Sequence, residues 1–245
     1  MSSEGGSPGR ETLCLFLLRS PHCLVVLYSI MLKPIITAAF LLASLPALAA
    51  SAKVERVDRP SDSPVPAGVW DVLDKHGYRL SLDDGSTVCD IWLRKSIPGS
   101  GAKEVEGVLF PEIAPSTLVG VISFPKPTTD FRGQQIKPGF YDLRYELIPN
   151  DGNHLGVSPN RDFVLLVPPA ADPDPAAEFK FDELVSLSRK ATGTNHPGPL
   201  SLVQADSAMP GLSHNDEDQW VFSFKMPVGP EQIPIGLIVK GVAQQ

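Results

Sequence analysis

The feature that most constrains the fold is an alternation of apolar and polar residues within short runs. The alternation is clearest in residues 140–147. Four apolar side chains fall on one face of an extended strand: Tyr141, Leu143, Tyr145 and Leu147. The other face carries Phe140, Asp142, Arg144 and Glu146. This period of two predicts a half-buried strand whose charged face meets solvent.

Similar short apolar runs recur from residue 78 to residue 240, and turn residues separate them. Asp84-Gly85 stands between two alternating runs and indicates a β-hairpin. Twenty-one prolines follow Ala49, which disfavours a helical bundle because proline lacks the backbone N–H donor. No strand–helix–strand rhythm is evident. The sequence therefore predicts a mainly β protein: an antiparallel β-sandwich of Greek-key or jelly-roll type.

One short helix is expected near residues 179–190. Phe181, Leu184 and Leu187 recur at a spacing of three, which places them on one helical face. Gly193 follows as a stop signal. Residues 68–74, in contrast, have the short apolar texture of a strand.

Residues 31–49 have the three parts of a secretory signal peptide in the expected order. Lys33 supplies the positive charge, residues 35–45 supply the apolar stretch, and Ala47-Leu48-Ala49 supplies the small-x-small cleavage pattern. We therefore expect cleavage after Ala49 and a secreted or periplasmic protein without stable membrane insertion. Residues 1–30 are then a start-site extension, with translation beginning at Met31.

An alternative interpretation makes residues 1–30 part of a longer N-terminal membrane anchor. Arg19, Pro21 and His22 interrupt the apolar residues there, and charged or polar side chains are costly in hydrocarbon. The remaining chain divides into an extended or disordered lead-in over residues 50–66 and a single β-sandwich domain over residues 67–245. This mature part has 196 residues, enough for one sizeable core.

The charge of the mature part disfavours two classes of partner. The whole chain carries −7, and residues 1–49 contribute three cations against two acids, so residues 50–245 carry −8. An acidic protein is repelled by nucleic acid and by anionic membranes. We therefore expect a small molecule, a glycan or a protein as partner, and no nucleic acid.

The stretch "NDGNHLGVSPNRDF", residues 150–163, is the densest in functional side chains. One interpretation is a long hairpin connection whose polar groups pair with each other or with the backbone. The other is a ligand-binding cluster at one end of the sandwich, where loops commonly carry binding residues. The ligand-binding candidates are Asp151, Asn153, His154, Arg161 and Asp162.

A second hypothesis concerns a divalent metal ion. His154, His196 and His214 all fall in expected loops and could converge as imidazole ligands, although no pair has the spacing that fixes a site locally. Otherwise no cofactor is expected. Motifs for phosphate-binding loops, dinucleotide binding, nucleophile elbows and zinc proteases are missing from the sequence, which favours a protein that is not an enzyme.

The run from Ile136 to Pro168, "IKPGFYDLRYELIPNDGNHLGVSPNRDFVLLVP", resembles a segment of uncharacterised secreted bacterial all-β proteins. The resemblance implies an exported all-β protein and transfers no catalytic residues. The favoured function is an exported soluble protein with a non-catalytic binding or structural role. The alternatives are a metal-binding protein or metal-dependent enzyme that uses the loop histidines, and a carbohydrate-binding module or hydrolase.

Overall fold

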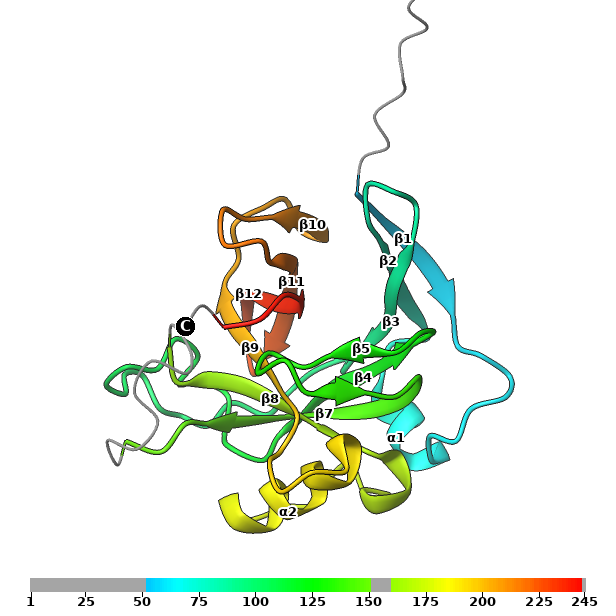
Figure 1. Ribbon diagram of the computed structural model, residues 1–245. Helices are drawn as coiled ribbons and strands as arrows, with labels where there is room; N and C mark the ends of the chain where they lie inside the picture. Colours follow the sequence, from blue (N-terminus) through cyan, green and yellow to red (C-terminus); the bar gives the residue numbers. More distant parts are fainter. Residues whose placement is uncertain (1–51, 151–159, 244–245) are drawn as a thin grey trace, which may run out of the picture. The chain divides into compact units, whose positions relative to one another are not determined.

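Twelve strands, two α-helices and one short 3-10 helix form the described part of the protein, residues 52–150 and 160–243 of a computed structural model (Figure 1). These residues belong to one compact unit, residues 49–245. The elements, in chain order, are β1 (Lys53–Asp58), α1 (Ala67–Val72), β2 (His76–Ser81), β3 (Thr87–Leu93), β4 (Leu118–Phe124), β5 (Thr128–Thr129), β6 (Gln135–Ile136), β7 (Gly139–Leu147), β8 (Asp162–Val167), η1 (Pro169–Ala171), α2 (Phe181–Thr192), β9 (Pro199–Gln204), β10 (Gly211–His214), β11 (Trp220–Val228) and β12 (Glu231–Lys240).

Ten of the strands form one antiparallel sheet in the order β1-β2-β3-β4-β7-β8-β9-β12-β11-β10. The prediction of a mainly β, antiparallel protein is confirmed, but two separate sheets are not. The reason lies in β9, whose first half pairs with β8 (Ser201 opposite Phe163) and whose second half pairs with β12 (Leu202 opposite Leu237). This double pairing joins the two halves into one strongly curved sheet.

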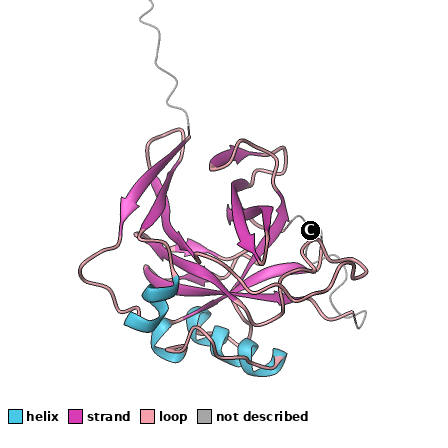
Figure 2. Ribbon diagram, turned by 180° about the vertical axis from the view of Figure 1, so that it is seen from behind, coloured by secondary structure: helices cyan, strands magenta, loops and turns pink. Residues whose placement is uncertain are grey.

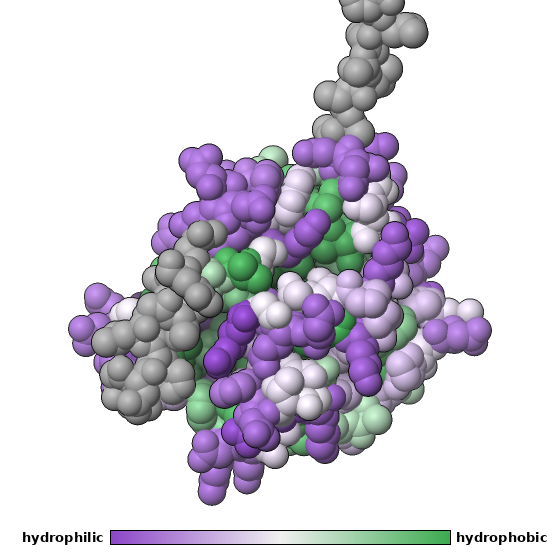
Figure 3. Space-filling view, viewed as in Figure 1, coloured by the Kyte–Doolittle hydropathy of each residue, from purple (hydrophilic) through white to green (hydrophobic). Residues whose placement is uncertain are grey.

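The curvature nearly closes the sheet around its main apolar core. The edge strands β1 and β10 approach each other on the open side (Figures 1 and 2). Inward side chains from both halves, such as Ile91, Leu143, Phe222 and Leu237, are buried in this core. Figure 3 shows apolar side chains at the surface between β10 and the β1–β2 hairpin.

The opposite, outer face of the sheet is covered by α1, η1 and α2 (Figure 2). α2 confirms the helix expected near residues 179–190, and it ends at Gly193, whose φ of 68° suits a residue without a side chain. The strand expected at residues 68–74 is wrong. Residues 67–72 form α1 instead, because one helical turn directs both Val69 and Trp70 onto the outer face beside Trp92.

The charged face of β7 is also buried, contrary to the half-buried strand that the alternation predicts. Asp142, Arg144 and Glu146 are 0%, 1% and 5% exposed. Asp172, from the segment between β8 and α2, forms a bidentate ion pair with Arg144 at 2.6 and 2.7 Å. A strand can therefore carry alternating charges and still be buried on both faces when a later segment supplies the counter-ion.

The expected lead-in over residues 50–66 contributes β1 to the sheet. β1 pairs with β2 in the register Val54 opposite Leu80. Downstream of β1, the side chain of Arg59 lies over the ring of Trp70, with its guanidinium carbon 4.7 Å from the ring centroid. Cation–π contacts of this kind stabilise by about 0.5–1 kcal/mol at exposed sites.

Candidate ligand-binding site

A pocket of about 260 Å³ lies where α2 meets β8, β9 and the turn after β5. Its apolar surface comes from five segments of the chain: Phe131, Ile148, Pro149, Phe163, Phe181, Val185, Pro197 and Pro199. Phe163 faces outward from β8, into the apolar cluster that also holds Leu184 of α2. The amphipathic face of α2 therefore both seals the outer face of the sheet and forms one wall of the pocket.

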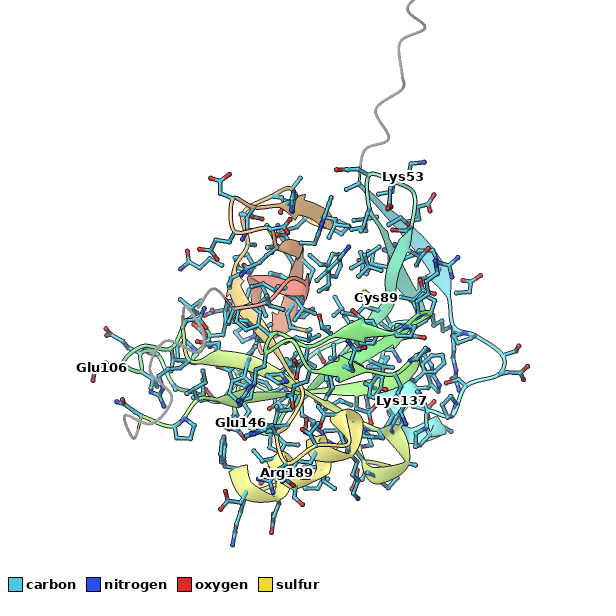
Figure 4. The ribbon with its side chains drawn as sticks, in the orientation of Figure 1. Lys53, Cys89, Glu106, Lys137, Glu146 and Arg189 are labelled. Atoms are coloured by element: carbon cyan, nitrogen blue, oxygen red, sulfur yellow. The ribbon has the colours of Figure 1, made fainter. Side chains whose placement is uncertain are left out.

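Polar side chains surround this apolar floor. They are Arg132, Asp182, Arg189, Asn195, His196 and Ser201. Neither Arg132 nor Arg189 forms an ion pair with another described residue. Figure 4 shows Arg189 on α2. The rim therefore carries the two arginines and the carboxylate of Asp182, and the buried carboxylate of Asp130 partly compensates the charge of Arg132.

A hydrogen-bond network fixes the loops that carry Arg132 and His196. The side-chain amide of Gln134 donates to the Asp130 carboxylate at 2.7 Å and to the Pro197 carbonyl at 2.8 Å. Thr194 donates its hydroxyl to the Gln134 carbonyl oxygen at 2.7 Å. The two walls of the pocket are therefore joined through side chains, which holds their separation constant.

Asp130 is the anchor of this network. Its carboxylate accepts hydrogen bonds from the backbone N–H groups of Arg132 and Gln134, at 3.0 and 2.8 Å. Burial raises the pKa of Asp130, while these hydrogen bonds oppose the shift because they stabilise the charged form. Main-chain bonds complete the frame: Phe131 N–H donates to the Pro199 carbonyl at 2.9 Å.

The structure describes two of the five predicted ligand-binding residues. Asp151, Asn153 and His154 lie outside the described residues. Arg161 donates from its side chain to the carbonyls of Ile148 and Glu106, at 2.9 and 3.0 Å. These bonds favour the interpretation in which Arg161 stabilises the loop connection.

Asp162 is fully buried, and both of its oxygens accept hydrogen bonds. They receive the backbone N–H groups of Leu109 and Phe110 at 2.8 and 3.0 Å, and the hydroxyl of Tyr145 at 2.6 Å. Burial together with this neighbouring carboxylate raises the pKa of Tyr145 far above its usual value. Asp162 therefore ties the loop at residue 110 to β7 and β8, which favours a structural role over contact with a ligand.

The two predicted metal ligands that the structure describes, His196 and His214, lie in different segments. His196 lines the pocket, whereas His214 lies on β10, where it bonds to Asp218 at 2.8 Å and stacks on Trp220. Within residues 52–150 and 160–243, no three His, Cys, Asp or Glu side chains are grouped so that they could hold a metal ion. Because His154 is outside these ranges, the metal site stays a prediction.

Sequence reasoning named His196 only as a candidate metal ligand, and it missed Arg132, Arg189 and the aromatic floor of this pocket. The residues come from turns and a helix that no local motif links, so only the fold brings them together. A comparison of the chain with protein-family models, with curated proteins and with solved structures finds no match. In the described ranges, no helix has the length and apolar character needed to cross a membrane.

Proposed function

We propose that this chain is an exported binding protein for a small organic acid, and that the pocket beside α2 is the binding site. The observation that carries the proposal is the combination of an aromatic and aliphatic floor with two rim arginines that form no ion pair within the described residues. The floor would cover an apolar ring or short chain. Arg132 or Arg189 would bind the carboxylate, because the planar guanidinium matches carboxylate geometry.

The size of the pocket limits the ligand. Pockets for drug-sized molecules usually measure about 300–1,000 Å³. A cavity of about 260 Å³ fits a molecule with one ring or a short branched chain. The chain is acidic as a whole, so the two arginines at this rim would attract an anion to this site rather than to the general surface.

The test is a titration with phenylacetate, which carries one ring and one carboxylate, followed by ¹H–¹⁵N NMR. We expect shift changes at Val185, Asn195 and His196 that saturate with a dissociation constant of about 0.1–1 mM, the range of a weak single-ring ligand. Phenylacetamide, the neutral analogue, should bind at least fivefold more weakly.

Two variants at neighbouring positions of α2 separate the pocket from general charge effects. Arg189→Gln should weaken phenylacetate binding about fivefold or more, whereas Lys190→Gln should leave it unchanged, because Lys190 is exposed and does not line the pocket. Val185→Trp should fill the cavity and remove binding. Equal affinity in all three variants would show that the pocket is not the binding site.

The export part of the proposal rests on residues 31–49. Expression of the full chain in a Gram-negative host, followed by periplasmic fractionation and N-terminal sequencing, tests it. We expect a mature N-terminus at Ala50. Recovery of the intact chain from the cytosol alone would refute export without affecting the binding proposal.

A further inference from the structure

A second cavity, of about 250 Å³, is lined in part by residues 175–178 of the segment between β8 and α2. Its lining includes the side chains of two arginines, Arg94 and Arg144, together with Ser116, Thr117 and Glu178. Pro98, Pro115 and Pro175 form apolar parts of the wall. The two arginines differ in the number of N–H donors that remain free to bind a ligand.

The guanidinium of Arg144 is fully used inside the protein. Its Nε and Nη2 atoms donate to Asp172, and Nη2 also donates to the Asp174 carbonyl at 2.8 Å. Nη1 donates to the carbonyls of Ser116 and Ala177, each at 2.8 Å. An arginine has five N–H donors, and all five have acceptors here. Arg144 therefore shapes the cavity but has no donor left for a ligand.

Arg94, in contrast, has N–H donors that remain available to a ligand. Its side chain is half-buried and forms no ion pair with a described carboxylate. Within the described residues its side chain has one hydrogen bond, which is long, 3.4 Å from Nη1 to the Leu118 carbonyl. Burial and the positive charge of Arg144 lower the pKa of Arg94, because both disfavour its charged form. An anion in the cavity would stabilise that charge.

The wall beside Arg94 is rigid. Ser116 has a φ of 69°, an uncommon conformation for a residue with a side chain. Three interactions hold it: its N–H donates to the Tyr145 carbonyl at 2.7 Å, its carbonyl accepts from Arg144, and its hydroxyl accepts from Phe179 N–H at 2.8 Å. Backbone strain of this kind is frequent at binding sites, where it fixes the position of a polar group.

We propose that this cavity is a second binding site, for a small aliphatic carboxylate, with Arg94 as the anchoring cation. The proline and alanine side chains of the wall would cover the aliphatic part. Exposed Glu178 lies at the rim and carries the same charge as the ligand, so it weakens binding. The site is independent of the pocket beside α2, because the two share no lining residue.

Propionate, formate and inorganic phosphate are titrated at constant ionic strength, and binding is followed by the ¹H–¹⁵N NMR signals of Thr117, Ala176 and Ala177. We expect millimolar binding, with propionate at least threefold tighter than formate because it adds apolar contact. Signals of Asn195 report the first pocket separately. Loss of binding at one set of signals therefore does not affect the interpretation of the other.

Two variants decide the role of charge. Arg94→Gln should weaken propionate binding at least tenfold, and Glu178→Gln, at an exposed position that leaves the fold unchanged, should strengthen it two- to threefold. Arg79→Gln, on the exposed ion pair with Asp90, is the control and should have no effect. Unchanged affinity in both Arg94→Gln and Glu178→Gln, or phosphate binding more tightly than propionate, would overturn the proposal.

Discussion

Asp142 is a buried carboxyl without a hydrogen-bond partner in the described part of the chain, and its substitution by asparagine gives the sharpest test of the fold. The side chain lies on β7 in register with Val121 of β4 and Val167 of β8. Neither carboxyl oxygen has a partner among the described residues. Burial raises the pKa of Asp142 from 3.8 to about 8; the charge of Asp172 adds to this effect and that of Arg144 opposes it.

The raised pKa of Asp142 makes the folded protein less stable as the pH rises. Between pH 3.8 and about 8 the folded chain keeps the proton of Asp142, whereas the unfolded chain releases it. The free energy of unfolding therefore has its full value from this group below pH 3.8 and decreases as the pH rises towards 8. At about 1.4 kcal/mol for each pH unit, the decrease amounts to roughly 4 kcal/mol at pH 7.

Asp142→Asn removes this titration and keeps the size of the side chain. Urea unfolding, followed by tryptophan fluorescence at pH 4, 5.5 and 7, measures both proteins. The buried amide adds a cost of about 1–3 kcal/mol that does not depend on pH. The decisive quantity is therefore the difference in unfolding free energy between variant and wild type. It should move in favour of the variant by roughly 4 kcal/mol from pH 4 to pH 7.

Other buried acids do not obscure the result. Glu146 and Asp130 also have pKa values raised by burial, but they titrate in both proteins and cancel in the difference. A difference that stays constant between pH 4 and pH 7 would show that Asp142 is not buried without partners. The arrangement of β7 beneath the covering segment would then be wrong.

Three further substitutions test separate parts of the structure. Asp172→Asn should destabilise the protein by about 3–5 kcal/mol in urea unfolding, because it leaves Arg144 as an uncompensated buried charge. Tyr145→Phe removes the 2.6 Å hydrogen bond to Asp162 and should lower the free energy of unfolding by about 1.5–3 kcal/mol; a loss below 0.5 kcal/mol would exclude a charge-assisted bond. Gly193→Ala should lower the melting temperature by a few degrees, since the left-handed φ of 68° costs a residue with a side chain roughly 1 kcal/mol.

The alternation of residues 140–147 was enough to predict the strand but not its surroundings. A period of two shows which side chains share a face, and β7 has the predicted faces. It does not show whether the charged face meets water or a counter-ion. Asp172, which neutralises Arg144, is 28 positions later in the chain, and no local pattern links the two. The single joined sheet was unpredictable for a similar reason, because it depends on how β9 divides its hydrogen bonds between two partners.

The candidate site was even harder to predict from the sequence than the fold. The high density of polar residues between Asn150 and Phe163 made this stretch a candidate site. Its two described charged residues, Arg161 and Asp162, form hydrogen bonds within the protein. Local density does not distinguish side chains that hold a loop from side chains that remain unpaired. In contrast, Arg132 and Arg189 are ordinary surface residues in the sequence. They become candidates only because the fold places both beside an apolar floor, and neither forms an ion pair within the part of the chain that the structure describes.

The segment from Pro168 to Thr192 explains why both cavities lie where they do. The buried pair of Arg144 and Asp172 holds the first part of the segment on the outer face of the sheet, and Leu184 holds its helix there. Residues 175–178, shortly after Asp172, line the second cavity, and α2 lines the first pocket. The buried ion pair therefore holds the segment that contributes to both sites. Loss of Asp172 should weaken the binding of both ligands together, whereas Arg94→Gln and Arg189→Gln should each weaken one. Independent loss of only one ligand on substitution of Asp172 would contradict this dependence on a shared covering segment.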